Sequence, residues 1–559
     1  MVAACRPRVP IKPVASRLRS PESHCLATYT PPSAPTVLAS IADSMVDPPP
    51  PRPQRTGQSQ SASPSERARQ SAGTNHSESE PSRARRLVIL AICCMSLLIV
   101  GLDSTIVNVA LPAIHRSFHG SLSGLQWTID AYTLVLASLL MLGGSTADRI
   151  GRRRVFQTGL VVFSAGSLLC ALAPTLELLV VFRIVQAIGG SMLNPVALSI
   201  IRNVFDDPRE RAQAIGLWGG VVGLSMALGP VLGGALVDSV GWRSVFLVNL
   251  PVGLLALGLA TAFIPESRAP RARRIDPVGQ VLVVTALASL TYAIIEGPGD
   301  GWSSLEIIGL FVLALGSFAA LTAYELRRAQ PLLEVRFFRS APFSGASVIA
   351  VCAFAALGGF LFLNTLYLQD VRGLSPFHAG LYTLPLAGMT VVFGPLSGRL
   401  VGRIGSRPSL VVAGAALCAA ALMLTRLSPT TSTAYLLGSY VIFGLGFGLV
   451  NPPITNTAVS GMPPSQAGVA AAVASTSRQV GQTLGVAIVG ALAGGSASGA
   501  LGPRFAAMTH PGWWVIAGLG VTVFVLGLLT TTHWAHETAR HTAERFREPR
   551  PVGSGAAAG

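Results

Sequence analysis

Three ionisable side chains, Asp103, Asp130 and Arg183, stand inside or at the edge of long apolar stretches of this chain. Charged groups are expensive within a bilayer, so each is a candidate for function. At a helical rise of about 1.5 Å per residue, Asp103 and Arg183 fall at similar depth. We predict that the three groups form a proton site, in which Arg183 keeps one carboxylate ionised while desolvation favours the protonated form of the other. The alternatives are a polar group satisfied by helix packing for Asp103, a structural ion pair for Arg183 and an interfacial position for Asp130.

Other polar residues in apolar runs are candidates for a substrate cavity. Gln186 follows Arg183 by three residues, so the two share a helix face. Arg478 is near the middle of a run in which Ser475, Gln479 and Gln482 lie on the same face, and a buried arginine there could bind substrate or a carboxylate. The predicted cavity residues are Gln186, Asn364, Asn451, Arg478 and Gln482. Ordinary helix packing is the alternative for the two asparagines.

A short charged connector, GGSTADRIGRRR at residues 143–154, joins two apolar runs. Gly151 permits a tight turn, and Asp148 can pair with nearby arginines or cap a helix. A weaker copy, SGRLVGRIGSR, stands at residues 397–407 and repeats the glycine as Gly405. We predict a cytoplasmic gate that is asymmetric, since Gly402 replaces the acid in the copy; it is made of Asp148, Arg149, Gly151 and Arg152. The plain alternative is a set of arginines that only fix membrane orientation.

The apolar run at 212–236 is dense in glycine and contains a proline. Small residues four apart allow close helix approach, and a proline removes a backbone donor and bends the helix. We predict a hinge between open states at Gly229, Pro230, Gly233 and Gly234. Ordinary close packing is the alternative.

The composition requires a membrane protein. Of 559 residues, 50% are hydrophobic and 12% charged, whereas soluble domains carry about 25% charged residues. A bilayer needs runs of about 20 residues, and the runs lack the alternation of barrel strands. We expect an all-α integral membrane protein with fourteen spans at residues 87–112, 126–147, 155–174, 178–201, 212–236, 243–264, 276–295, 305–325, 342–368, 378–398, 408–425, 434–457, 467–493 and 512–532.

The net charge of +16 reflects orientation rather than nucleic-acid binding. Connectors on one side of the predicted spans hold 18 arginines and those on the other side hold 5. The positive-inside rule therefore places both termini in the cytoplasm. We expect a disordered cytoplasmic tail at 1–84 and a cytoplasmic tail at 535–559. Between them we expect six spans in 87–264, an extra pair in 276–325 and six spans in 342–532.

No motif indicates an enzyme or a bound cofactor. The sequence lacks a phosphate-binding GxxxxGK[ST] loop, a nucleophile elbow and any Cys/His metal spacing among its seven cysteines. We therefore expect neither catalytic nor metal-binding residues, and we expect energy to come from an ion gradient.

These motifs together resemble the major facilitator superfamily, specifically its fourteen-helix drug:proton antiporter branch. The resemblance covers about residues 87–532. The connector 144–154 is similar to the family's loop between helices 2 and 3, and residues 102–112 (LDSTIVNVALP) to the helix 1 motif. Arg183 and Gln186 are similar to the helix 4 motif associated with proton coupling. Gly229-Pro230 and Gly233-Gly234 are similar to the helix 5 antiporter motif. The segment that enters helix 6 is matched by Trp242-Arg243, Phe246, Asn249 and Pro251.

The resemblance implies two six-helix bundles that alternate access to a central cavity. It implies exchange of protons for lipophilic or cationic drugs and small organic molecules, across the inner (plasma) membrane. We expect Asp103 to be the chief protonation site, with small molecules, protons and lipid as partners, no nucleic acid, and a monomer. A proton symporter that imports a small solute is the main alternative, although the glycine-proline motif argues against it. A membrane sensor and a lipid-modifying enzyme are further alternatives.

Overall fold

The computed structural model describes residues 82–269, 275–328, 331–460, 467–494 and 505–546. Within these ranges the regular structure is entirely helical. The predicted disordered tail, apart from its last residues, and residues 547–559 of the predicted C-terminal tail lie outside the described residues.

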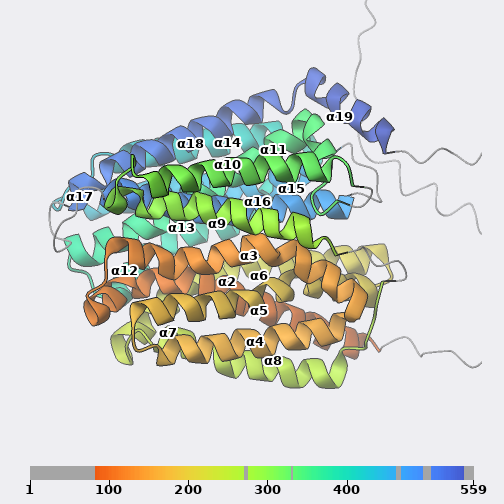
Figure 1. Cartoon of the computed structure of the whole chain (residues 1–559), viewed down its shortest axis with the longest axis horizontal. Helices are drawn as coiled ribbons and strands as arrows, with labels where there is room; N and C mark the ends of the chain where they lie inside the picture. Colours follow the sequence, from red (N-terminus) through yellow and green to blue (C-terminus); the bar gives the residue numbers. More distant parts are fainter. Residues whose placement is uncertain (1–81, 270–274, 329–330, 461–466, 495–504, 547–559) are drawn as a thin grey trace, which may run out of the picture. The chain divides into compact units, whose positions relative to one another are not determined.

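The first half of the described chain forms a group of helices that we call the N-bundle (Figure 1). Its members are α2 (Arg83–Phe118), α3 (Leu122–Ile150), α4 (Arg152–Leu172), α5 (Leu176–Val204), α6 (Pro208–Ser239), α7 (Ser244–Leu247) and α8 (Asn249–Phe263). Two further helices, α9 (Pro277–Asp300) and α10 (Leu305–Glu325), form an extra pair that packs together.

The second half forms the C-bundle, which follows a short 3-10 helix, η1 (Val335–Arg339). Its members are α11 (Ala341–Leu366), the π-helical turn η2 (Tyr367–Val371), α12 (Pro376–Tyr382), α13 (Leu384–Ile404), α14 (Arg407–Leu424), α15 (Thr433–Val459), α16 (Ala467–Gly494), α17 (Phe505–Met508) and α18 (His510–Leu529). A last helix, α19 (His533–Arg545), packs on α11 and η1 within the predicted C-terminal tail.

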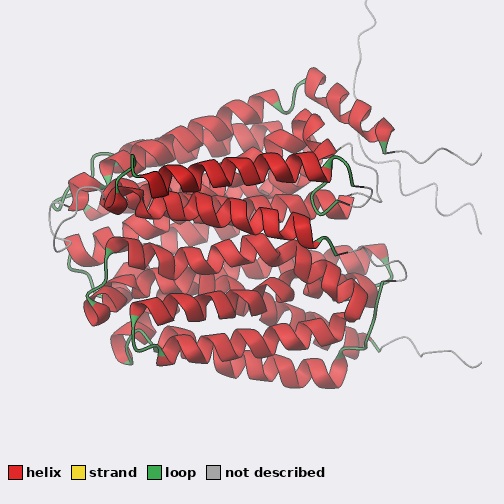
Figure 2. Cartoon of the chain, in the orientation of Figure 1, coloured by secondary structure: helices red, strands yellow, loops and turns green. Residues whose placement is uncertain are grey.

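Thirteen membrane-span candidates in the described part of the chain are long and apolar enough to cross a bilayer. The helix α16 is 28 residues long and coincides with the predicted span at 467–493. With α16 the described residues provide the fourteen spans that the sequence predicts. Helices account for the regular structure of this part of the chain, as Figure 2 shows.

Side-chain caps explain where many helices begin. A hydroxyl or carboxylate accepts a backbone N–H of the first turn, which otherwise has no partner in the helix. The capping residues are Ser82, Ser121, Thr175, Asp207, Asp276, Ser304, Ser375 and Ser432. The spans are therefore bounded by local polar chemistry as well as by hydropathy.

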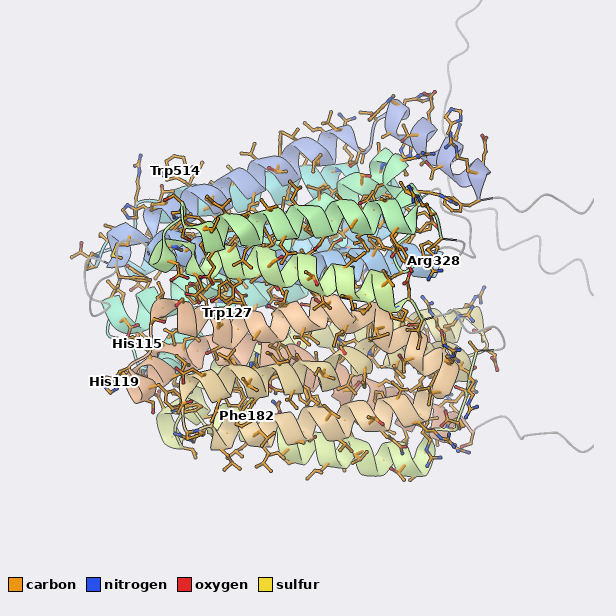
Figure 3. The ribbon with its side chains drawn as sticks, in the orientation of Figure 1. His115, His119, Trp127, Phe182, Arg328 and Trp514 are labelled. Atoms are coloured by element: carbon orange, nitrogen blue, oxygen red, sulfur yellow. The ribbon has the colours of Figure 1, made fainter. Side chains whose placement is uncertain are left out.

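Two seams join the N-bundle to the C-bundle. Along one seam α3 packs against α16, and along the other α6 packs against α12 and α13. The extra helix α9 contacts both α3 and α16 and so lies along the first seam. Nε1 of Trp127, which is labelled in Figure 3, donates to Glu296 Oε1 of α9 at 2.7 Å, and Gln280 Nε2 of α9 donates to the Ser138 carbonyl at 2.8 Å.

Candidate functional site

Asp103 is the centre of a fully buried polar cluster in the N-bundle. Its Oδ2 accepts Arg183 Nη1 at 2.5 Å, and its Oδ1 accepts Gln186 Nε2 at 2.8 Å and Asn249 Nδ2 at 3.0 Å. Ser167 Oγ accepts both amide groups, at 2.7 and 3.3 Å. We call these five residues, from α2, α4, α5 and α8, the Asp103 cluster. The structure therefore brings Asp103 and Arg183 together as a buried ion pair.

The Arg183 side chain is 1% exposed, and its guanidinium contacts several groups of the N-bundle. Its Nε donates to the Thr128 carbonyl at 3.0 Å and its Nη1 to Gln186 Oε1 at 2.7 Å. The guanidinium lies 4.1 Å from the ring centre of Tyr132 and 5.7 Å from that of Phe246. A buried ion pair is stable when hydrogen bonds satisfy the remaining atoms of both ions. Both Asp103 oxygens and the Nε and Nη1 of Arg183 have such partners.

Asp130 lies outside the Asp103 cluster, which corrects the expectation that all three groups form one site. Thr128 and Tyr132, two residues to either side of it on α3, contact Arg183. Residues two apart point to different faces of a helix, so Asp130 faces away from the cluster. Its neighbours along the helix, Gln126 and Thr133, hydrogen-bond α16.

The Asp130 carboxyl group is 0% exposed, and neither of its oxygens has a hydrogen-bond partner among the described residues. A buried ionised carboxylate without a partner carries a large free-energy cost, whereas the neutral form does not. The two acids therefore differ in environment. Asp103 accepts hydrogen bonds at both oxygens, and Asp130 accepts none from the described residues.

The charged connector at the end of α3 turns at Gly151, whose φ is +132°. Arg152 binds Asp148 Oδ1 through Nε at 3.2 Å and Nη2 at 3.0 Å. Glu266, which follows α8, accepts the Arg153 backbone N–H at 3.2 Å and lies 3.6 Å from Arg154 Nε. The described partners of this connector are thus within the N-bundle, and the sequence reasoning missed Glu266.

The glycines of α6 make two kinds of close contact. A side chain at Gly229 or Gly233 would collide with Thr105 or Ile106 of α2. A side chain at Gly234 would collide with the Pro376 carbonyl of α12. Of the predicted hinge residues, Gly229 and Gly233 therefore allow close packing of α6 on α2 within the N-bundle. Gly234 allows close packing of α6 on α12 of the C-bundle.

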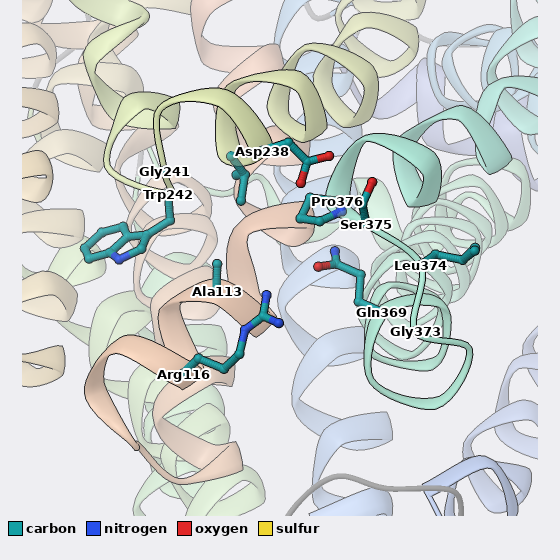
Figure 4. A pocket seen from close by; sticks show the side chains of 11 residues that line it. Ala113, Arg116, Asp238, Gly241, Trp242, Gln369, Gly373, Leu374, Ser375 and Pro376 are labelled. Atoms are coloured by element: carbon teal, nitrogen blue, oxygen red, sulfur yellow. The ribbon is translucent and has the colours of Figure 1, made fainter.

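The two bundles meet tightly at the end of the spans where α2 terminates, which we call the Phe118 end. Phe377 N donates to Asp238 Oδ2 at 2.9 Å, and Gln369 Nε2 donates to the Val109 carbonyl at 2.8 Å. Both bonds join the N-bundle to the C-bundle. A pocket of about 530 Å³ lies between them, with Arg116, Asp238 and Gln369 facing it from three segments (Figure 4).

We call the opposite end of the spans, where α2 begins, the Arg83 end. A Cβ at Gly223 of α6 would lie 3.5 Å from Val391 of α13, in the C-bundle. A Cβ at Gly216 or Gly220, nearer the Arg83 end, would have no atom within 4 Å, and the same holds for Gly402 of α13. Close contacts of α6 with the C-bundle are therefore found at Gly223 and Gly234, and open space lies beside Gly216 and Gly220.

The predicted cavity residues fall in different places: Gln186 and Asn364 are buried within separate bundles, whereas Arg478 and Gln482 lie one turn apart on α16 and Arg478 bonds α15 near Asn451. Gln186 belongs to the Asp103 cluster, and Asn364 is buried in the C-bundle, where its Oδ1 accepts the Tyr440 hydroxyl. Gln482 is 8% exposed and packs near Gly358. Arg478 donates to Thr455 Oγ1 at 2.6 Å, and Asn451 lies one turn before Thr455 on the same helix.

Two bundles of membrane-spanning helices meet at the Phe118 end, and one of them holds a buried ion pair. This arrangement is that of a multi-pass membrane transporter. Residues 93–486 match the family model of the Major Facilitator Superfamily. The chain belongs to this superfamily.

Two curated relatives and one solved structure illustrate the similarity. The chain is 37% identical over 419 residues to multidrug resistance protein Stp of Mycobacterium tuberculosis, covering 75% of this chain and 78% of that protein. It is 38% identical to the tetracenomycin C resistance and export protein of Streptomyces glaucescens, again covering 75% and 78%. A bacterial homologue of the human lysosomal transporter Spinster, in an inward-facing and unoccupied conformation, aligns with a TM-score of 0.56 at 20% identity, covering 84% of this chain and 100% of that one.

Proposed function

We propose that this protein exports drugs and other small organic molecules in exchange for protons. The names of its relatives, which include multidrug resistance and antibiotic export proteins, support the export of such compounds. The proposal of proton coupling rests on the different surroundings of two buried acids of the N-bundle. Asp103 is paired with Arg183, and Asp130 has no partner in the described residues.

The geometry favours a reversal of the roles that the sequence suggests. We assign proton carriage in this conformation to Asp130, because an unpartnered buried carboxyl group is stable in its neutral form. Asp130 lies on the face of α3 that contacts α16, so a change of its charge acts directly on a seam between the bundles.

The Asp103 cluster then serves as the coupling element. A proton on Asp103 weakens its attraction to Arg183, and the freed guanidinium must find other partners. The cluster ties α2, α4, α5 and α8 together, so its rearrangement changes the packing of the whole N-bundle. Arg183 is therefore proposed as a positioning residue that responds to the charge of Asp103.

The close contacts at the Phe118 end and the open space beside Gly216 and Gly220 suit one state of an alternating-access cycle. We propose that the Arg83 end faces the cytoplasm, because the arginine-rich connectors lie there. We further propose that both termini lie in the cytoplasm and that the protein acts as a monomer in the inner (plasma) membrane. The Asp148–Arg152 connector would form its contacts with the C-bundle in the opposite state, when this end closes.

Reconstituted vesicles test the proposal by the direction of flux. With an acidic lumen, protein oriented with its Phe118 end inside should accumulate a dye in the lumen as protons leave it. A symporter would instead move dye and protons in the same direction. Dye movement that follows the proton flux would overturn the antiport mechanism.

A further inference from the structure

Arg478 of the C-bundle has no acidic partner among the described residues. Arg478 lies in the middle of α16, and its guanidinium donates to Thr455 Oγ1 at 2.6 Å and to Ser475 Oγ at 3.5 Å. Its Nε is buried without a hydrogen-bond partner, and no carboxylate of the described residues lies within 4 Å of it.

Arg478 lies among helices of the C-bundle that also contact the N-bundle. Thr455 is on α15, and Phe354, whose ring centre is 5.9 Å from the guanidinium, is on α11. Both α11 and α16 also contact the N-bundle, through α2 and α3. Thr455 is exposed, and the Arg478 and Phe354 side chains are half-buried.

The two buried acids of the N-bundle, Asp103 and Asp130, do not neutralise this charge. Asp103 is occupied by Arg183, Gln186 and Asn249. Asp130 lies near residues 483–487 of α16, because Gln126 bonds the Val486 and Ala487 carbonyls and Thr133 bonds Thr483. Arg478 is at least five residues closer to the Arg83 end, which is about 7 Å or more along a helix axis.

We propose that Arg478 binds the anionic group of the substrate, and that the protein favours amphipathic organic acids over organic cations. This inference rests on the proposed export function and names its substrate class. The planar guanidinium recognises a carboxylate or phenolate through paired hydrogen bonds, while the half-buried Phe354 ring beside it offers apolar contact to the rest of the molecule. Substrate would thus supply the counter-ion that the described residues lack.

Two dyes with a related ring system and opposite charge provide the test. Binding of fluorescein, an anion, and of rhodamine 123, a cation, is measured with the purified full chain by fluorescence anisotropy. We expect fluorescein to bind about 10-fold or more tightly than rhodamine 123, since a hydrogen bond to a charged group contributes that much. Arg478→Gln should abolish the preference, and Arg478→Lys should keep part of it.

Arg336→Gln is the matched control, because Arg336 is a half-exposed arginine on η1 outside the spans. It should leave the preference unchanged. Equal or tighter binding of rhodamine 123 by the unaltered protein, absence of fluorescein binding, or an unchanged preference in Arg478→Gln would each overturn the proposal. Binding in detergent needs no proton gradient, so a failure of antiport would be seen separately in the vesicle experiment.

Discussion

Replacing Asp103 by asparagine tests the Asp103 cluster in two independent ways. The substitution keeps the shape of the side chain but removes its charge, which leaves the Arg183 guanidinium, 1% exposed, without a counter-ion. Removal of one partner of a buried ion pair costs about 3–5 kcal/mol. Because Gln186, Thr128 and the Tyr132 ring still contact the guanidinium, we expect the lower part of this range, about 3 kcal/mol.

The double variant Asp103→Asn/Arg183→Gln separates stability from transport. It removes both charges, so the free energy of unfolding should recover by about 2 kcal/mol relative to the single variant. Proton-driven export should remain absent in both, because neither retains a carboxylate at this position. Denaturant titration of purified protein measures the first quantity, and dye accumulation in vesicles with a pH difference measures the second.

Two results would refute this reasoning. Full proton-driven export by Asp103→Asn would show that the carboxylate has no role in coupling. A single variant as stable as the unaltered protein would show that the ion pair contributes no net stability and that the neighbours of Arg183 hold its charge alone.

Three further predictions concern other parts of the fold. Asp130→Asn mimics the neutral carboxyl group, so it should change the free energy of unfolding by less than about 1 kcal/mol while proton-driven dye accumulation stops; continued accumulation would contradict the proton-carrying role. Gly234→Ala places a methyl group against the Pro376 carbonyl and so weakens the contact between α6 and α12. Cysteines introduced at the Phe118 end should then react faster with a membrane-impermeant thiol reagent. Gly216→Ala, whose methyl group meets no atom within 4 Å, should not change the labelling rate. Gly151→Ala should lower the free energy of unfolding by about 1 kcal/mol or more beyond the loss caused by Gly405→Ala, as measured by denaturant titration. Both glycines have positive φ, but only a side chain at Gly151 would collide with Glu266. Equal losses of stability in the two variants would show that the contact with Glu266 is unimportant.

The spans follow closely from the sequence because hydropathy is a property of each segment alone. Even α16, which carries Arg478 and two glutamines, coincides with its predicted range. Helix starts are similarly local, since a single Ser, Thr or Asp satisfies the first free N–H groups. The turn at Gly151 and its copy at Gly405 were predictable from composition, and both have positive φ.

The partners in the candidate site were less accessible, because they come from distant segments. Asn249 and Ser167 reach Asp103 only when α8 and α4 pack beside α2, and single-sequence patterns carry no record of that packing. Asp130 was grouped with Asp103 on depth alone. The side of α3 that faces Arg183, which carries Tyr132 and not Asp130, is defined only when the helices pack.

The hinge interpretation shows where local rules leave two outcomes open. A glycine-rich helix with a proline permits both bending and close packing. The structure shows close packing at Gly229, Gly233 and Gly234. Opening of the Phe118 end must then separate α6 from α12, whether or not α6 bends.

The most direct test of proton coupling is simultaneous recording of dye and proton flux in vesicles that contain the purified protein. The account predicts that dye accumulates only while a pH difference exists, that each addition of dye drives protons in the opposite direction, and that a protonophore stops accumulation. Accumulation that continues after the pH difference is collapsed would contradict it.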